Sequence, residues 1–366
     1  MHQEGKAQFE IGEAFFRPAT VVVRDLGVLA AAVYRRERGQ LRVLDVMAAC
    51  GVRSLRYALE SNADWVWTNE GNPELEALLQ RNLAPISGHL TLENAQRILN
   101  RCAAERDYFD LVDVDCFGDA MPYLRLALGA VRLGGLLYLT STDGRSLTGH
   151  LPLNSLRSYG VVARSHPSAQ EQALRILLGA LQQQAASMGL GIEPVLSFFT
   201  GQTYRVMVRL VHQPQLQTQN YGFLGYCHRC GEYQRVDWLK LGRVSCPGCD
   251  RPATITGPMW LGNLHDRPFL AMMQTHAQAR QWPERVALLA TLQAEADLPP
   301  YFYTLGEIGK RGKLALPPRD ALIAALIAQG YRAAATHINA QAIKTEASLQ
   351  DCVAIAQTLR QRWGRV

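Results

Sequence analysis

Leu41-Arg42-Val43-Leu44-Asp45-Val46 runs directly into Met47-Ala48-Ala49-Cys50-Gly51-Val52-Arg53, and this stretch decides the fold class. The first half is a short run of residues that favour a β-strand. Small residues and Gly51 follow, and a helical pattern then covers residues 54–60. A strand that passes through a small-residue loop into a helix is the beginning of a βα unit.

Further strands are expected after this unit. Runs of β-forming residues occupy 65–69, 110–115 and 136–140, and a helical pattern covers 73–82. Strands that alternate with helices over this length predict an α/β domain with a parallel, doubly wound, Rossmann-like sheet. Residues 203–211 alternate as in an antiparallel strand and are expected to close the sheet. Ligands of such sheets bind beyond the carboxyl ends of the strands.

The loop at 45–53 is not a Gly-x-Gly-x-x-Gly motif, which argues against a dinucleotide. A sulfonium cofactor has no pyrophosphate and needs no three-glycine cradle. We therefore assign Asp45, which closes the strand, and Gly51, which precedes the helix, to a cofactor loop. Glu70 ends the next strand, where an acidic side chain can accept hydrogen bonds from ribose hydroxyls.

The third strand ends in Asp113-Val114-Asp115-Cys116-Phe117-Gly118. Alternation along a strand places Asp113 and Asp115 on the same side. A carboxylate beside an aromatic ring can hold an amino-bearing base, the ring by stacking and the carboxylate by accepting a hydrogen bond. Asp115 and Phe117 are therefore the candidate catalytic residues. Two alternatives stay open: Asp115 caps the following helix, or Phe117 is a core residue beneath the sheet.

Composition places the chain among packed globular proteins. It has 366 residues, of which 48% are hydrophobic and 19% charged, so two domains are expected. No stretch approaches the roughly 18 apolar residues of a membrane span. The first residues have neither the basic nor the apolar region of a secretory signal. We expect a cytoplasmic protein with no membrane association.

Four of the eight cysteines follow the pattern Cys227-x2-Cys230-x15-Cys246-x2-Cys249. Two Cys-x2-Cys knuckles separated by a short loop are typical of a tetrahedral zinc site. Four thiolates leave no open position, so the Zn2+ is expected to be structural rather than catalytic. The module should cover about residues 221–256, and a thiolate site suits a reducing compartment.

Positive charge is concentrated at the end of the chain. The net charge is +6, and residues 305–366 hold nine basic and four acidic residues. This bias indicates a polyanion such as nucleic acid, or else merely a solvated face. The residues that we expect to neutralise RNA phosphates are Lys310, Arg311, Lys313, Arg332 and Lys344. His337 is either a contact near the target or a structural residue.

A domain boundary is expected in the Gln-rich stretch 212–220, which has no apolar pattern. We therefore expect a catalytic domain over residues 1–213 and a C-terminal RNA-binding domain over 214–366. The second domain combines helical patterns at 283–297, 304–307 and 317–329 with a strand-like stretch at 331–336. It should be a mixed α/β module.

Several segments resemble, in order and spacing, one family: the tRNA guanine-N2 dimethyltransferases, which modify the guanine at position 26 of tRNA. The segments are Phe15-Phe16-Arg17-Pro18 with Arg24-Asp25, Leu44-Asp45 through Gly51-Val52-Arg53, Asn69-Glu70, Asp113 through Gly118, Thr142-Asp143-Gly144, Gly257-Pro258-Met259-Trp260-Leu261-Gly262, and Thr336-His337 with Ile343-Lys344-Thr345. The resemblance covers nearly the whole chain. It implies a class I S-adenosyl-L-methionine-dependent methyltransferase fold followed by a C-terminal domain special to the family.

The resemblance also implies cofactor contacts that composition and spacing do not give. Phe15 and Arg24 would lie against the cofactor, with Arg24 facing its carboxylate, and Arg53 would reach it too. Asn94 and Ala95 align with a family Asp-Ala pair that borders the adenine. Asn94 therefore replaces an acidic residue, for which the neighbouring Glu93 is a candidate substitute.

Asp115 and Phe117 match the family motif Asp-Pro-Phe-Gly, in which Asp115 also borders the cofactor, but Cys116 stands in place of Pro. Proline at this position would fix φ and restrain the loop. Cys116 is either a small hydrophobic residue or an accessible thiol. Asp115 would accept an N2–H hydrogen bond from guanine while the methyl group arrives.

The expected function is therefore S-adenosylmethionine-dependent methylation of the exocyclic N2 of guanine 26 of tRNA, giving N2-methyl- and N2,N2-dimethylguanosine. One alternative is an amino-methyltransferase that acts on ribosomal RNA guanine or on DNA adenine. Another is an RNA-binding protein with a decayed transferase site, which Cys116 and Asn94 favour. The expected partner is tRNA, and we expect a monomer.

Overall fold

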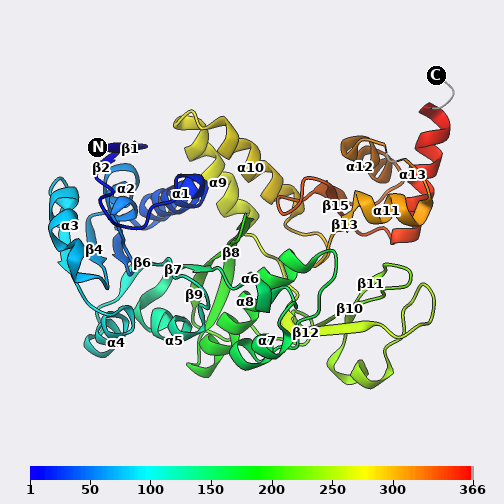
Figure 1. Cartoon of the computed structure of the whole chain (residues 1–366), viewed down its shortest axis with the longest axis horizontal. Helices are drawn as coiled ribbons and strands as arrows, with labels where there is room; N and C mark the ends of the chain where they lie inside the picture. The colour runs from blue at the N-terminus through cyan, green and yellow to red at the C-terminus, as the bar shows by residue number, and fades with distance from the viewer. Residues whose placement is uncertain (316, 364–366) are drawn as a thin grey trace. The chain divides into compact units, whose positions relative to one another are not determined.

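The computed structural model describes residues 1–315 and 317–363, which form two compact units interleaved along the chain (Figure 1). The first unit comprises Met1–Asp143, Leu181–Gln215 and Pro268–Leu289. The second comprises Gly144–Ala180, Leu216–Arg267 and Ala290–Val366. Arg365 and the side chain of Arg362, both part of the basic C-terminal count, lie outside the described residues.

A seven-stranded sheet forms the centre of the first unit. In spatial order its strands are β5 (Gly88–Thr91), β4 (Trp65–Asn69), β3 (Arg42–Asp45), β6 (Phe109–Val114), β7 (Val131–Ser141), β9 (Thr203–Val211) and β8 (Gly191–Thr200). The first five are parallel, and β9 pairs antiparallel with both β7 and β8. The expected doubly wound sheet is confirmed, as is its closure by an antiparallel strand at 203–211.

Helices cover both faces of this sheet (Figure 1). Helix α1 (Val21–Arg38) packs against α2 (Val52–Ser61), and α4 (Ala95–Glu105) packs against α5 (Met121–Ala130). The helical elements of this part of the chain are η1 (Pro18–Thr20), α1 (Val21–Arg38), α2 (Val52–Ser61), η2 (Pro73–Leu75), α3 (Glu76–Leu83), α4 (Ala95–Glu105) and α5 (Met121–Ala130). A small hairpin of β1 (His2–Glu4) and β2 (Ala7–Phe9) precedes them.

Strand register brings acidic residues together at one edge. All six residues of β6 are buried, as expected for a central strand covered on both faces. In the β3–β6 ladder, Leu44 pairs with Val112 and Asp45 with Asp113. Neighbouring parallel strands therefore deliver both carboxylates to the carboxyl edge of the sheet.

The second unit holds two small antiparallel sheets. One contains β11 (Tyr233–Val236), β10 (Tyr221–Tyr226) and β12 (Thr254–Trp260), and the other β13 (Tyr303–Thr304), β15 (Ala342–Thr345) and β14 (Ala333–Ala335). Its helices are α6 (Gly144–Leu147), α7 (Pro152–Tyr159), η3 (Trp238–Arg243), α11 (Leu305–Gly312), α12 (Arg319–Ala328) and α13 (Leu349–Trp363). This confirms the expected mixed α/β character of the C-terminal part.

Three longer helices have residues in both units: α8 (Ala169–Ser187), α9 (Arg267–Ala279) and α10 (Pro283–Glu295).

Among the described residues, no helix combines the length and apolar character that crossing a membrane requires.

Candidate active site

The loop between β3 and α2 is held in a shape that only small residues allow. Gly51 has φ +78°, and a Cβ atom added there would lie 3.1 Å from Leu79 Cδ2. Ala49 also has a positive φ, and its backbone N–H donates to Glu70 Oε2 at 2.7 Å. The other Glu70 oxygen accepts from the backbone N–H of Asn72 at 2.9 Å. The structure thus brings Glu70 and the Gly51 loop together, as their spacing predicts.

Asp45 lies beneath this loop rather than on its surface. Its side chain is fully buried and accepts a hydrogen bond from Ser54 Oγ at 2.7 Å. Burial, followed by the nearby Asp113 charge, raises the pKa of the Asp45 carboxyl. Asp45 therefore anchors the first turn of α2 from below, in contrast to Glu70, which is partly exposed.

Two arginines hold the Asp115 carboxylate. Arg53 donates to Oδ2 from Nε at 3.0 Å and from Nη2 at 2.5 Å. Arg205 Nη1 donates to Oδ1 at 2.9 Å, and Thr140 Oγ1 donates to the same oxygen at 2.6 Å. Burial alone would raise the pKa of the Asp115 carboxyl, but Arg53 and Arg205 hold it well below its usual range. Asp115 is therefore a fixed anion at neutral pH.

Asp113 shares the same two arginines from a deeper position. It is fully buried and lies 3.0 Å from Arg205 Nη2 and 3.4 Å from Arg53 Nη1. Tyr57 Oη donates to it at 2.6 Å. The shared partners confirm that Asp113 and Asp115 lie on one side of β6. Asp113 has no exposure to solvent, whereas the Asp115 side chain is 33% exposed. Only Asp115 is open to a ligand.

The loop after Asp115 separates a buried thiol from an exposed ring. Cys116 is 3% exposed and donates to the Thr140 carbonyl oxygen at 3.0 Å, and burial raises the pKa of its thiol to about 12. Cys116 is thus a small buried residue and not a reactive thiol. Phe117 is 91% exposed, which excludes the alternative of a core residue. Gly118 (φ +77°) makes the turn that separates them and donates its N–H to Thr142 Oγ1.

Arg24 and Phe15, assigned to the cofactor by resemblance alone, have different surroundings. Arg24 is 5% exposed and makes a two-point ion pair with Glu4, at 2.6 and 2.5 Å. Its guanidinium also lies 4.9 Å from the centre of the Phe16 ring. Phe15, by contrast, is 75% exposed. The structure supplies an acidic partner for Arg24 and leaves Phe15 free to contact a ligand.

Asn94 and Ala95 begin α4, beside the end of β5. The Asn94 side chain is the N-cap of α4 and accepts from the Gln96 N–H at 2.9 Å. The Glu93 carboxylate pairs with Arg101 at 2.7 Å. Asn94 therefore has a structural role that explains a short polar side chain here, and Glu93 is already engaged by a cation.

The four cysteines meet in the second unit. Their Sγ atoms all lie within 4.8 Å of one another. Sγ–Sγ distances are 3.6 Å for Cys227–Cys249 and 3.2 Å for Cys230–Cys246. Tetrahedral Zn2+ with Zn–S bonds of about 2.3 Å requires sulfur atoms roughly 3.8 Å apart, so the cluster fits this ion.

Matching turns build the two halves of the cysteine cluster. The Gly231 N–H donates to the Cys227 carbonyl at 2.7 Å, and the Asp250 N–H donates to the Cys246 carbonyl at 2.8 Å. Both donors have positive φ. The equivalence of the two knuckles fits the expected structural zinc site, because each offers its two thiolates in the same geometry.

Comparison with known proteins agrees with this geometry. A model of the N2,N2-dimethylguanosine tRNA methyltransferase family matches residues 2–357. The chain belongs to this family. The tRNA (guanine(26)-N(2))-dimethyltransferase of Pyrococcus horikoshii is 31% identical over 374 residues, which cover 94% of each chain. That of Thermococcus kodakarensis is 31% identical over 353 residues, covering 91% of this chain and 90% of the relative.

A solved structure of this family gives the same fold. The complex of Trm1 from Pyrococcus horikoshii with S-adenosyl-L-methionine matches with a TM-score of 0.83 and 27% sequence identity. The match covers 97% of this chain and 98% of that one. The resemblance read from scattered motifs is therefore confirmed at the level of family and fold.

The residues expected to bind RNA fall into two groups. Lys310 and Lys313 are exposed. Arg332 is 57% exposed and pairs with Glu346. Arg311 is partly buried, pairs with Glu307 at 2.9 Å and donates to the Arg229 carbonyl.

Lys344 and His337 form the second group, and both are buried. The Lys344 side chain is 2% exposed, and its ammonium lies 2.8 Å from Glu171 Oε1. The His337 ring is completely buried and hydrogen-bonds the Glu295 carboxylate. Neither side chain can reach a phosphate from these positions. We therefore correct their assignment from RNA contacts to structural residues.

Sequence reasoning missed Arg205, which completes the carboxylate cluster. It lies inside β9, is fully buried, and its guanidinium lies 3.7 Å from the centre of the Tyr138 ring. A signal was present, because an arginine in an apolar strand next to the catalytic strands needs a buried anion. The partner was not evident, since Asp115 is separated from Arg205 by 90 residues.

Proposed function

We propose that this chain transfers methyl groups from S-adenosyl-L-methionine to the exocyclic N2 of guanine 26 of tRNA, producing N2,N2-dimethylguanosine. The observation that carries the proposal is the Asp115 carboxylate, held by Arg53 and Arg205 at the open edge of a class I sheet, beside an exposed Phe117. Family membership and relatives that cover almost the whole chain agree with it.

Residues at the carboxyl edge of the sheet fit the cofactor. Glu70 has a partly exposed carboxylate fixed by two backbone N–H groups, which suits it to accept from ribose hydroxyls. The Gly51 loop allows close approach, and we assign Arg24, Arg53 and Phe15 to its methionine end. Asn94 and Ala95 are assigned to the adenine border, and Asp45 to support of the loop. When bound, the cofactor supplies an electrophilic methyl group on a cationic sulfur.

Asp115 serves as a hydrogen-bond acceptor for the target and not as a general base. Guanine N2 is a weak nucleophile because its lone pair is delocalised into the ring. An anion that accepts one N2–H favours the pyramidal form of the nitrogen and stabilises the positive charge that develops there. Its low pKa means that it does not retain the proton, which leaves for solvent at neutral pH.

A base can reach Asp115 only if one of its present partners gives way. Four donors from Arg53, Arg205 and Thr140 already contact the carboxylate, which has about four lone-pair positions. We assign Arg53 as the group that leaves, since its other expected partner is the cofactor. Arg205 is buried more deeply and stays to orient the carboxylate.

Phe117 provides the stacking surface for the target base. The base lies within a folded RNA, so exposing it costs a few kcal/mol of stacking. An aromatic ring that is 91% exposed beside the acceptor can return part of this free energy. Cys116 replaces a proline of the family motif, but its buried thiol holds the loop through the Thr140 carbonyl instead.

The remaining assignments concern RNA and organisation. Lys310, Arg311, Lys313 and Arg332 are proposed to neutralise tRNA phosphates, a contact that positions RNA without reading its sequence. We propose a catalytic domain over 1–213, a tRNA-binding domain over 214–366 with a structural Zn2+ on Cys227, Cys230, Cys246 and Cys249, and a monomer that acts in the cytoplasm.

Nucleoside mass spectrometry tests the proposal. Unmodified tRNA transcripts, with guanine 26 intact or replaced by adenine, are incubated with enzyme and S-adenosylmethionine. We expect dimethylguanosine that disappears when guanine 26 is replaced. Methylation that survives the replacement would move the target to another guanine. Cofactor binding without methylation of any transcript would contradict tRNA as the substrate.

A further inference from the structure

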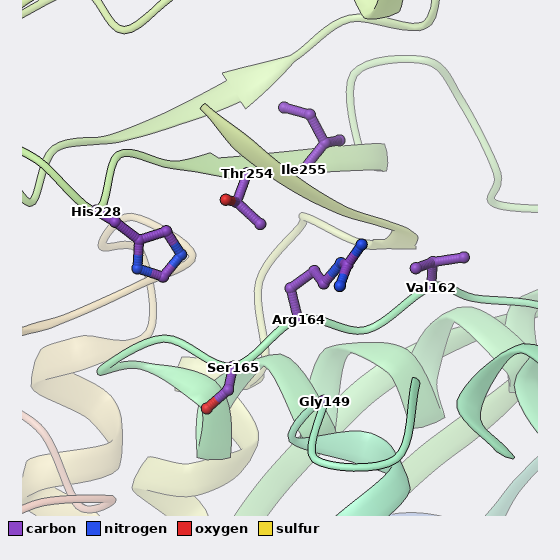
Figure 2. A pocket seen from close by; sticks show the side chains of 7 residues that line it. All are labelled: Gly149, Val162, Arg164, Ser165, His228, Thr254 and Ile255. Atoms are coloured by element: carbon purple, nitrogen blue, oxygen red, sulfur yellow. The ribbon is translucent and has the colours of Figure 1, made fainter. Parts of the chain in front are cut away.

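A hollow of about 570 Å³ lies in the second unit, next to the first zinc knuckle (Figure 2). Its wall on one side is the segment between α7 and α8, through Val162, Arg164 and Ser165. The other side is the first residues of β12, and His228 of the Cys227–Cys230 knuckle closes one end. Neither the catalytic residues nor the basic residues at 310–332 line it.

The walls of this hollow are built by specific contacts. Val162 forms a β-bridge with Gly257, and the Arg164 N–H donates to Thr256 Oγ1 at 3.2 Å. Gly149 lies so close behind that an added Cβ atom would be 2.4 Å from the Arg164 carbonyl carbon. Gly149 also has φ +83°, so only glycine suits this position. The backbone that carries Arg164 is therefore fixed on both sides.

The charge of the hollow favours an anion. Its described lining contains Arg164 and His228 with the hydroxyls of Ser165 and Thr254, and no carboxylate. Within the described part of the chain, the exposed Arg164 guanidinium has no ion-pair or hydrogen-bond partner. Arg175, Arg311 and Arg332 of the same unit each pair with a glutamate. Among the described residues Arg164, like the exposed Arg157, has no such partner, and it differs from Arg157 in lining the hollow.

We propose that this hollow is a binding site for the sugar-phosphate backbone of tRNA, in which Arg164 holds a phosphodiester. Ser165 and Thr254 can donate hydrogen bonds to it, while Val162 offers an apolar contact to the adjoining ribose or base. A hollow of this volume is larger than one phosphate needs and fits a nucleotide unit. The proposal rests on tRNA being the substrate and adds a second contact region, beside the zinc module.

The zinc site gains a role from this assignment. His228 lies between Cys227 and Cys230, so a Zn2+ held by these cysteines would fix the position of one end of the hollow. Backbone contacts made here would orient the RNA without reading sequence. The structural ion would then organise an RNA-binding surface as well as stabilise its own module.

Arg164→Ala in the full-length enzyme tests the site. We expect the Kd for an unmodified tRNA transcript to rise roughly fivefold at moderate salt, and the slope of log Kd against log salt to fall by about one. Arg164→Lys should restore most of the affinity. Arg157→Ala is the matched control, because Arg157 is also exposed, lies on the neighbouring α7 and does not line the hollow. Equal effects of the two alanine variants would overturn the proposal.

A second pair of variants removes the dependence on one arginine. Ser165 is exposed, so Ser165→Glu should leave the melting temperature unchanged while placing a negative charge in the hollow. We expect it to weaken tRNA binding at least as much as Arg164→Ala, and Ser165→Gln to have little effect. Unchanged binding in Ser165→Glu would also overturn the proposal.

Failure of this site is distinguishable from failure of the proposed function. Wild-type enzyme must bind and methylate the transcript in the same experiment, and S-adenosylmethionine binding must be equal in all variants. If wild-type enzyme binds and methylates tRNA but the Arg164 and Ser165 variants match it, only the hollow is refuted. If wild-type enzyme neither binds nor methylates tRNA, the proposed function fails, and with it the identity of the anion.

Discussion

Each unit buries a group of paired charges, and the two groups differ in how far they are exposed to solvent. In the first, Asp113 and Asp115 share Arg53 and Arg205, and the Asp115 side chain remains 33% exposed. In the second, Glu171 pairs with Arg175 and Lys344, and none of the three side chains is more than 2% exposed. Both groups hold their carboxylates with cationic partners, but only the first leaves a carboxylate open.

The difference shows that a buried ion pair is not in itself a site. Desolvation of charged groups costs free energy, and paired partners offset that cost without adding much net stability. The Glu171 group ties α8 to β15 and has no remaining surface for a ligand. Asp115 is also held by ion pairs but is partly exposed to solvent. This arrangement suits a group that must be ionised and oriented before its target arrives.

The largest effect is expected at the open carboxylate. Asp115→Ala should lower single-turnover methyl transfer by about a thousandfold, because the charge that favours pyramidal N2 is lost. Asp115→Asn keeps the shape and should still lose about a hundredfold. Filter binding should show tRNA affinity within about twofold of wild type. Methyl transfer that persists in Asp115→Ala would remove Asp115 from the mechanism.

A variant of the buried Glu171 group should change the stability of the protein and not its methyl transfer. Lys344→Met leaves Glu171 with Arg175 alone, and we expect the free energy of unfolding in urea to fall by about 2 kcal/mol, because Glu171 loses one charged hydrogen-bond donor. Lys310→Met, at an exposed lysine, should leave stability unchanged and reduce the salt dependence of tRNA binding slightly. If Lys344→Met instead weakened tRNA binding at unchanged stability, the original assignment of Lys344 to RNA would stand.

A variant of Phe117 distinguishes a role in methyl transfer from a role in core packing. Phe117→Ala should lower single-turnover methyl transfer about tenfold through lost stacking. The free energy of unfolding should change by less than about 0.5 kcal/mol, since the ring is 91% exposed. Phe117→Trp is the matched control and should retain most of the activity. A large loss of stability in Phe117→Ala would mean that the ring packs in the core.

The smallest expected effect is that of the Asp115 carboxyl on the pH dependence of stability. The pKa of Asp115 is depressed in the folded protein, so its contribution is present above the unfolded pKa near 4 and is lost as pH falls below it. Unfolding monitored between pH 6 and pH 3 should show a fall that Asp115→Asn reduces by roughly 1 kcal/mol. Equal pH dependence in the two proteins would show that the carboxyl is not held ionised.

Much of the first unit follows from local sequence. The strand at 65–69, the helix after Gly51 and the antiparallel strand at 203–211 are all confirmed, because alternation and small-residue loops are properties of neighbouring residues. Glu70 and Asp115 could be placed at one edge for the same reason, since parallel strands end at a common edge. The cysteine knuckles were predictable because the Cys-x2-Cys spacing itself places the two thiolates for metal binding.

Partners of charged side chains were not predictable in this way. His337 and Lys344 were expected to contact RNA because they stand in a basic segment, yet their partners Glu295 and Glu171 lie 42 and 173 residues away in sequence. Arg205 was missed for the same reason. Charge in the sequence indicates that a partner exists, and only the folded chain decides whether that partner is protein or ligand.

Sequence alone thus determined the class of fold, the pair of cysteine knuckles and the choice of Asp115 and Phe117 as candidates, since each depends on spacing along a strand or turn. Tertiary structure decided which charges are open. It left Asp115, Phe117 and Arg164 at the surface, and it closed Asp113 and Lys344 inside. The physical reason is that burial and ion pairing depend on the whole chain, whereas strand alternation and knuckle spacing depend on a few consecutive residues.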